Sequence, residues 1–171
     1  MSNIVNLDQV FTNFLSNLIP HNPFFNSFFS FFSLKGSSIL VWLLVIMIVV
    51  ILEERKNPGI SKRDKKFIIL FSLSFLLTAF FADIVLKNIF MRPRPILDTC
   101  PHDFSFPSAH AATAFAAATV LAYFDKKRRW FYYTVAILIS YSRIYLGCHY
   151  FLDVVVGTII GYIISRLLLF S

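Results

Sequence analysis

Long apolar runs separated by short basic loops are the feature that most limits what this chain can fold into. A helix needs about 17–25 apolar residues to cross a hydrocarbon core of roughly 30 Å. We predict five such helices, in chain order Ser38–Leu52, Phe67–Lys87, Ser108–Phe124, Trp130–Leu146 and Tyr150–Leu169. Because lipid offers no hydrogen bonds to an open backbone, helices are the element expected in these runs. The sequence therefore predicts an all-α, polytopic membrane helical bundle.

Composition supports the same fold class. Of the 171 residues, 57% are hydrophobic and 21 are phenylalanine, which is more apolar surface than a soluble domain of this length can bury. The length fits one domain, so residues 1–171 are expected to form a single unit. The first 20 residues lack a basic start and a small-residue cleavage site, so no cleavable signal peptide is expected.

Residues 1–36 form a distinct N-terminal segment. Its first part carries an apolar stripe with helical spacing, made of Ile4, Leu7, Phe11, Phe14, Leu15 and Leu18. Pro20 and Pro23 are expected to end this helix, and a Phe-rich stretch, Phe24–Phe32, leads on to Gly36. We expect the helix to lie in the membrane interface, and an ordinary packing helix is the alternative.

The distribution of basic residues predicts the orientation of the chain in the membrane. The loops after the first and third spans and the C-terminal end hold 11 of the 16, namely Arg55, Lys56, Lys62, Arg63, Lys65, Lys66, Lys126, Lys127, Arg128, Arg129 and Arg166. The side richer in Lys and Arg is normally cytoplasmic. The loop 88–106 and the turn at Gly147 are then expected on the periplasmic face of a bacterial inner membrane. The basic clusters also suit anionic lipids, so we expect no nucleic-acid partner.

Residues able to bind and attack a phosphate gather on the predicted outer face. They form three blocks, which are Lys87 with Arg92-Pro93-Arg94-Pro95, then Pro107-Ser108-Ala109-His110, then Ser142-Arg143 with His149 and Asp153. Lys and Arg neutralise a tetrahedral phosphate, and the N-terminus of a helix adds backbone N–H groups. His149 and Asp153 are four residues apart, so on a helix they share a face and can touch.

This pattern predicts nucleophilic chemistry at phosphorus. A carboxylate on one imidazole nitrogen fixes the tautomer and leaves the other nitrogen free to attack. His110, which lies on a different helix, is placed to protonate the departing oxygen. The sequence has neither a carboxylate cluster suited to Mg²⁺ nor a zinc-binding set, so we expect no metal and no other cofactor.

The three blocks resemble the motifs of the type 2 phosphatidic acid phosphatase (PAP2) family. That family shows Lys-x6-Arg-Pro, then Pro-Ser-Gly-His, then Ser-Arg-x5-His-x3-Asp. The corresponding segments here read KNIFMRPRP, PSAH and SRIYLGCHYFLD, in order within residues 87–153. Three spaced blocks in order are far more specific than any one of them. Within the family, the chain resembles bacterial lipid phosphatases of the lipid A 1-phosphatase type.

The resemblance implies a role for each matched residue. His149 would be the nucleophile that forms a phosphohistidine, Asp153 would orient it, and His110 would be the acid. The residues expected to bind phosphate are Lys87, Arg94, Ser108, Arg143 and the backbone of Ala109. Ala109 stands where the family usually has Gly, and the site tolerates this unless that residue needs a positive φ. Phe151 replaces a common Pro and should affect only the helix start.

The resemblance also implies a membrane lipid phosphate as the substrate. Lipid A 1-phosphate is the first candidate, followed by phosphatidylglycerophosphate and undecaprenyl pyrophosphate. A lipid phosphotransferase and a non-catalytic lipid-phosphate binder are the alternatives from other classes. Beyond the substrate and the bilayer, no obligatory protein partner is expected.

Several residues near the blocks have plainer interpretations. Lys87 taken alone would be a lysine at a helix end, paired with Asp83 one turn earlier. Arg92 is expected to be a surface residue, with contact to a second phosphate or a sugar as the alternative. His102 and Asp103 are expected to lie in a solvated loop, with headgroup binding as the alternative.

The two cysteines are both expected on the outer face. Cys100 follows the first block and Cys148 immediately precedes His149. In an oxidising periplasm they can form a disulfide that holds the loop against the catalytic turn, and two free thiols are the alternative. Their spacing fits no zinc site.

Overall fold

The computed structural model describes residues 2–33, 41–42, 44–47, 61–95, 100 and 102–170. Its elements are α1 (Ser2–Ser16), α2 (Pro23–Ser33), α4 (Lys62–Ala79), η1 (Phe80–Leu86), α5 (Lys87–Phe90), α6 (Ala109–Phe124), η2 (Lys126–Arg128), α7 (Arg129–Tyr145) and α8 (Phe151–Phe170). The described residues contain helices and no strands, which confirms the all-α prediction. The first predicted span, Ser38–Leu52, is helical at 41–42 and 44–47, and the rest of it lies outside the described residues. The number of five spans therefore stays a prediction.

The second predicted span is longer than expected at both ends. α4, η1 and α5 follow one another without a break and form one helix over Lys62–Phe90. It begins before the predicted start at Phe67 because Ser61 and Asp64 form a capping box, in which each side chain accepts the other's backbone N–H. It ends at Met91, which adopts the left-handed conformation with a φ of 46°.

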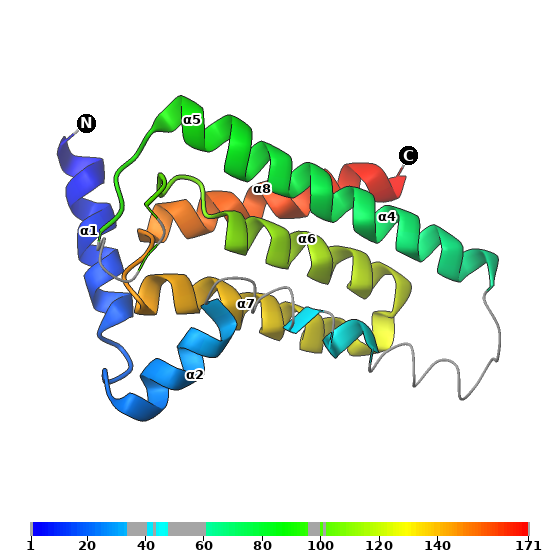
Figure 1. Cartoon of the computed structure of the whole chain (residues 1–171), viewed down its shortest axis with the longest axis horizontal. Coiled ribbons are helices and arrows are strands. Elements are labelled where there is room, and N and C mark those ends of the chain that lie inside the picture. The colour runs from blue at the N-terminus through cyan, green and yellow to red at the C-terminus, as the bar shows by residue number, and fades with distance from the viewer. Residues whose placement is uncertain are drawn as a thin grey trace.

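α6 lies at the centre of the bundle and packs against α4, α7 and α8 (Figure 1). The alanines between Ala111 and Ala118 are buried, and such small side chains allow neighbouring helices to pack closely. Two glycines of α8 permit the close approach. A Cβ on Gly157 would lie 2.5 Å from the carbonyl oxygen of Ser108, and one on Gly161 would lie 1.9 Å from that of Ala112. This contact fixes the start of α6 against the start of α8.

Among the described residues, two helices have the length and composition needed to cross a bilayer. They are Lys62–Phe90, with a mean hydropathy of 2.3, and Phe151–Phe170, with a mean hydropathy of 1.9. Large apolar side chains along both remain exposed, among them Leu76 on α4 and Leu167 on α8. An apolar surface of this extent is typical of a lipid-facing protein.

α1 turns two of its polar residues toward the protein and its large apolar residues mostly away from it. Asp8 and Thr12 are buried, whereas Leu7, Val10, Phe11, Phe14 and Leu18 are exposed. A packing helix in water would show the reverse, so this orientation supports the interfacial interpretation.

The Phe-rich stretch differs from its prediction, because it forms the helix α2. Pro23 occupies the first position of that helix, where its missing N–H costs nothing. Pro23 therefore begins a helix instead of ending one. Gly36, the expected end of the segment, lies outside the described residues.

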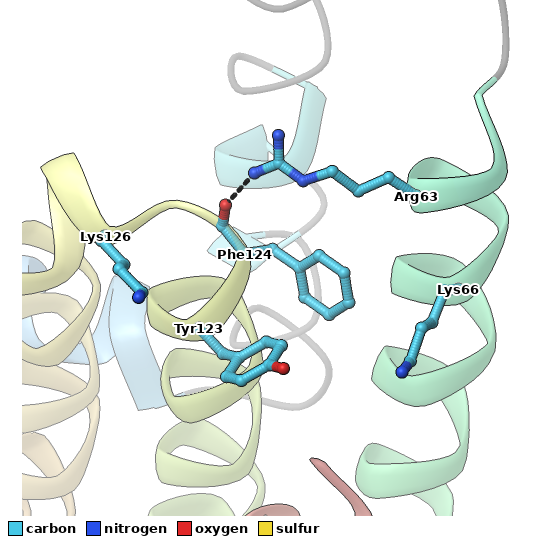
Figure 2. A pocket seen from close by; sticks show the side chains of 5 residues that line it. All are labelled: Arg63, Lys66, Tyr123, Phe124 and Lys126. Atoms are coloured by element: carbon cyan, nitrogen blue, oxygen red, sulfur yellow. Dashed lines mark hydrogen bonds between the residues drawn. The ribbon is translucent and has the colours of Figure 1, made fainter. Parts of the chain in front are cut away.

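The two ends of the bundle carry different features (Figure 1). The three motif blocks meet at the end where α5 and α7 finish and α6 and α8 begin. At the opposite end, an open pocket of about 340 Å³ lies between the start of α4 and the end of α6. Its lining is Arg63, Lys66, Tyr123, Phe124 and Lys126 (Figure 2).

Candidate active site

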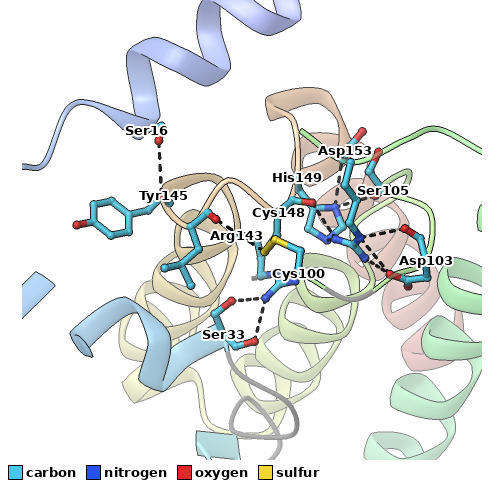
Figure 3. Close-up of a disulfide and its surroundings, with 12 residues drawn as sticks. Ser16, Ser33, Cys100, Asp103, Ser105, Arg143, Tyr145, Cys148, His149 and Asp153 are labelled. Atoms are coloured by element: carbon cyan, nitrogen blue, oxygen red, sulfur yellow. Dashed lines mark hydrogen bonds and ion pairs between the residues drawn. A yellow bond between two sulfur atoms is a disulfide. The ribbon is translucent and has the colours of Figure 1, made fainter. Parts of the chain in front are cut away.

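The structure brings the three motif blocks together in a largely buried cluster. Figure 3 shows the third block, with Arg143, His149 and Asp153. Six of the eight predicted site residues are buried, namely Lys87, Arg94, Ser108, Arg143, His149 and Asp153. The other two, Ala109 and His110, are partly buried in the first turn of α6. Burying this many ionisable groups at a membrane face is costly, so their convergence indicates a functional site.

Hydrogen bonds on both ring nitrogens determine the tautomer of His149. Its Nδ1 lies 2.7 Å from the carbonyl oxygen of Ser105, and its Nε2 lies 2.8 Å from Nη1 of Arg94. A carbonyl oxygen can only accept and a guanidinium can only donate. The proton is therefore on Nδ1, and Nε2 presents a lone pair toward the cationic cluster.

The surroundings of His149 also keep its ring neutral. Burial lowers the pKa of His149 well below its usual value, and the positive charges of Arg143, Arg94 and Lys87 lower it further. The hydrogen bond to Ser105 acts in the opposite direction and is outweighed. At neutral pH the imidazole is thus an unprotonated base.

Asp153 approaches His149, although through a different geometry from the one expected. Its Oδ2 lies 3.6 Å from Nδ1 of His149, which is an ion-pair distance and too long for a hydrogen bond. His149 precedes α8, which begins at Phe151, so the two residues do not share a helix face. The same Oδ2 accepts the backbone N–H of Tyr150 at 2.9 Å. The direct partner of Nδ1 is Ser105, which the sequence motifs do not indicate.

Ser105 is held in place by the segment that carries the first block. Its backbone N–H donates to the carbonyl oxygen of Arg92 at 2.8 Å, and its hydroxyl donates to that of Pro93 at 3.1 Å. These two contacts aim the carbonyl of Ser105 at the ring of His149. The position of the nucleophile candidate thus depends on a loop residue outside all three motifs.

Asp103 is an exposed loop residue, as expected, but its carboxylate also pairs with two cations of the cluster. Its carboxylate accepts from Nε of Arg94 at 3.0 Å and from Nη2 at 2.5 Å, and it also pairs with Lys87. Burial raises the pKa of Asp103, but the hydrogen bonds from Lys87 and Arg94 outweigh it and leave the pKa below its usual value. Lys87 also pairs with Asp83 at 2.5 Å, as predicted. The neighbouring residue His102 is exposed as well.

Arg143 has unused donors deep in the protein. Nη1 donates to the carbonyl oxygen of Ser33 at 2.9 Å and also to the Ser33 hydroxyl, both at the end of α2. Nε and Nη2 are buried and have no hydrogen-bond partner among the described residues. Unpaired buried donors are costly, so this guanidinium is suited to receive an anion.

The second block lies at the N-terminus of α6. Ser108 is the N-cap, where its hydroxyl accepts from the N–H of Ala111 at 3.4 Å and its own N–H donates to the carbonyl oxygen of Asp153 at 2.9 Å. Ala109 begins the helix and does not adopt a positive φ. Alanine therefore fits where the family has glycine. His110 interacts electrostatically with Arg143 and His149.

Arg92 is not the surface residue that the sequence suggests. Its guanidinium lies between two buried carboxylates, with Nη1 2.7 Å from Asp153 and Nη2 2.5 Å from Asp8 of α1. It also lies 3.9 Å from the ring centre of Tyr150. Asp8 gave no signal in the sequence, because it is a single acid on an otherwise uncharged helix.

A disulfide joins Cys100 and Cys148, with their Cα atoms 5.5 Å apart (Figure 3). The prediction of a bridge is confirmed over that of two free thiols. It attaches the segment before the second block to the residue that precedes His149. Gly147 adopts a φ of 70°, as expected for the turn between the last two spans.

Comparison with known proteins agrees with the three blocks. The undecaprenyl-diphosphatase of Sulfolobus acidocaldarius is 33% identical over 128 residues, which cover 74% of this chain and 61% of that protein. The match thus spans less than two thirds of that relative. The lipid A 4'-phosphatase of Bacteroides thetaiotaomicron is 32% identical over 162 residues, which cover 82% of this chain and 67% of that protein. The crystal structure of Aquifex aeolicus LpxE matches with a TM-score of 0.68 and 30% identity over 96% of both chains.

The family model of the PAP2 superfamily matches residues 67–170, which is more than half of the sequence. All three motif blocks, from Lys87 to Asp153, lie within this region. The chain therefore belongs to the PAP2 superfamily.

Proposed function

We propose that this protein is a metal-independent phosphatase that removes a phosphate from a membrane lipid through a phosphohistidine on His149. The observation that carries the proposal is the neutral imidazole of His149, whose Nε2 lone pair points at Arg94 among buried cations. An unprotonated nitrogen beside fixed positive charges can attack an anionic phosphate without first losing a proton.

In the first step, the lone pair of Nε2 forms a bond to phosphorus while the bond from phosphorus to the lipid oxygen breaks. Protonated His110 gives its proton to the departing oxygen. The ring of His149 then carries a positive charge, because Nδ1 keeps its proton. Asp153, 3.6 Å from Nδ1, stabilises that charge.

In the second step, neutral His110 takes a proton from water. The oxygen of that water bonds to phosphorus, the bond to Nε2 breaks, and its electron pair returns to the ring. Phosphate is released, and both histidines are restored. Ser108 and the backbone N–H groups at the start of α6 would bind the transferring phosphoryl group together with the cations.

Lys87, Arg94 and Arg143 are the proposed phosphate ligands. Arg143 offers its free Nε and Nη2, whereas the other two are neutralised by Asp103. A bound phosphate would take the place of the Asp103 carboxylate on these cations. It would also take Nη1 of Arg94 away from Nε2, which frees the nucleophile.

We place the protein in the inner membrane with this site facing the periplasm. The disulfide supports the placement, because such bonds persist in oxidising compartments. Lipid A 1-phosphate is the first substrate candidate. The resemblance to the Bacteroides lipid A 4'-phosphatase supports a lipid A phosphate, since it covers more of both chains than the resemblance to the Sulfolobus undecaprenyl-diphosphatase. Phosphatidylglycerophosphate and undecaprenyl pyrophosphate are the alternatives.

Phosphate release from detergent-solubilised lipids in the presence of EDTA tests the proposal. The panel contains lipid A, phosphatidylglycerophosphate and undecaprenyl pyrophosphate, and the variants are His149→Ala and Asp153→Asn. We expect turnover by the wild type in EDTA and a loss of at least about a thousandfold in His149→Ala. Full activity of that variant, or strict dependence on a metal, would overturn the mechanism. Phosphorylated lipid in place of free phosphate would instead identify a phosphotransferase.

A further inference from the structure

The N-terminal helix α1 reaches the candidate active site through a chain of charges. Asp8 of α1 binds Arg92, and Arg92 binds Asp153, the carboxylate nearest to His149. The side chains of both aspartates are fully buried, and that of Arg92 is 22% exposed. One guanidinium is thus shared between two buried carboxylates that come from opposite ends of the sequence.

The same helix also supplies hydrogen bonds to the start of α8. The backbone N–H of Phe151 donates to the hydroxyl of Thr12, and that of Leu152 donates to Oδ1 of Asp8, each at 2.9 Å. The first N–H groups of a helix have no partner within the helix and need one elsewhere. α1 therefore caps α8 directly after the turn that carries His149.

In each aspartate, one carboxylate oxygen accepts a backbone N–H near the start of α8 and the other pairs with Arg92. Asp8 uses Oδ1 for the N–H of Leu152 and Oδ2 for Arg92. Asp153 uses Oδ2 for the N–H of Tyr150 and Oδ1 for Arg92. With both oxygens engaged, the carboxylate of Asp153 cannot rotate freely, so its distance from Nδ1 of His149 is fixed.

We propose that Asp8 and Arg92 are positioning residues that hold Asp153 against His149 during the reaction. The inference rests on the proposed function, because Asp153 stabilises His149 most when phosphorylation gives the ring a positive charge. Arg92 keeps Asp153 in place. Asp8 shares the charge of Arg92, so that Asp153 retains enough negative charge to stabilise the phosphohistidine.

Neither residue occupies a position that the family motifs specify. Asp8 lies outside residues 67–170, which the family model matches, and the motif arginine of the first block is Arg94. Arg92 pairs with Asp153 directly, and Asp8 is linked to Asp153 through Arg92. The proposal therefore makes α1, with its exposed apolar face, part of the catalytic unit and not only a membrane contact.

Steady-state kinetics on the full-length protein in detergent, with the lipid substrate that the panel identifies, test this inference. Asp8→Asn removes a charge but keeps an oxygen for the N–H of Leu152. Arg92→Gln removes the shared cation, and Arg92→Lys restores it. We expect kcat to fall about 10- to 100-fold in Asp8→Asn and Arg92→Gln, with KM changed less than about threefold. Arg92→Lys should recover part of kcat, and the Asp8→Asn/Arg92→Gln double variant should lose less than the product of the two single losses.

Two neighbours on α1 provide the controls. Gln9→Ala changes an exposed residue next to Asp8 and should match the wild type. Thr12→Val removes the cap on Phe151 without changing charge, so it should lower the unfolding temperature with less than about a threefold effect on kcat.

Three results would overturn the inference. The first is a kcat of Asp8→Asn within about twofold of the wild type. The second is a decrease of kcat in Thr12→Val as large as that in Asp8→Asn. The third is a kcat of Arg92→Lys no higher than that of Arg92→Gln. If Arg92→Gln fails to fold, Asp8→Asn decides the question alone. His149→Ala separates the two proposals. If this variant is active, the proposed function is contradicted. If it is inactive while Asp8→Asn is fully active, only this inference is contradicted.

Discussion

The two ends of the bundle use the same basic residue types in opposite ways. At the site end, Lys87, Arg92 and Arg94 are each paired with carboxylates, and Lys87 and Arg94 are buried. At the other end, Arg63 and Lys66 are exposed and line an open pocket together with Lys126, without a carboxylate among its lining residues (Figure 2).

The two groups of cations differ in the free energy that is needed to remove each charge from water. A buried charge must be held by partners, and those partners fix its direction. An exposed Lys or Arg is solvated and keeps its freedom, so it contributes to membrane orientation or to anionic lipid contacts without a defined geometry. Position in a network, and not residue type, separates the residues proposed for catalysis from those expected to set topology.

The largest contrast is expected between Arg94→Ala and Arg63→Ala. Arg94 contacts His149 and is a proposed phosphate ligand, whereas Arg63 is exposed and donates to the carbonyl oxygen of Phe124. We expect kcat/KM to fall about 100- to 1,000-fold in Arg94→Ala and to stay within about twofold in Arg63→Ala. Phosphate-release assays on both variants measure the contrast. An equal decrease of kcat/KM in the two variants would contradict the proposed difference between the two ends of the bundle.

Asp103→Asn sharpens the comparison by releasing two cations at the site end. The carboxylate occupies Lys87 and Arg94 when no phosphate is bound, so its removal should favour anion binding. The inhibition constant of inorganic phosphate should fall by about 3- to 10-fold, as measured by competition in the turnover assay. A higher inhibition constant would show that Asp103 assists binding instead of competing with it. Asp64→Asn, which affects only the capping box of α4 at the other end, is the matched control.

Gly161→Ala tests whether helix packing supports the site end. A Cβ there would meet the backbone carbonyl of Ala112, which cannot move aside as a side chain can. We expect the free energy of unfolding to fall by about 1–3 kcal/mol, seen as a lower midpoint of thermal unfolding in detergent. An unchanged midpoint would mean that α6 and α8 lie further apart than described.

The smallest effect concerns pH. Because the pKa of His149 is depressed, protonation of this ring should not reduce activity near pH 6.5, where an ordinary imidazole titrates. Below about pH 6.5, His149 binds a proton in the unfolded chain but stays unprotonated in the folded protein. The free energy of unfolding should therefore decrease as the pH falls toward the pKa of His149 in the folded state. A stability that increases in this range would contradict the assignment. Thermal unfolding and initial rates across the range measure both.

The fold was largely predictable from the sequence, since apolar runs and caps depend on local residues. The later helices begin and end close to the predicted limits, because Ser108 and Gly147 mark their boundaries directly. The Phe-rich stretch was misjudged for a physical reason, because proline both ends helices and occupies their first position.

The site was predictable only where motif residues carry it. Ser105, Asp103 and Asp8 contact the motif residues through the tertiary fold, and no spacing along the chain indicates such contacts. Every residue has a backbone carbonyl oxygen, so the residue type at position 105 does not indicate that its carbonyl accepts from Nδ1 of His149. Arg92 was misjudged because its two acceptors lie 84 residues before it and 61 residues after it in the sequence.

The most direct test of the central claim is to trap the covalent intermediate. The protein is mixed with a substrate labelled with radioactive phosphorus and denatured within its first turnover, and the labelled residue is identified by proteolysis and mass spectrometry. We predict label on His149 that is lost in acid and retained in alkali, present in the wild type and absent from His149→Ala. Label on another residue, or turnover of the wild type with no labelled protein at any time, would contradict the account.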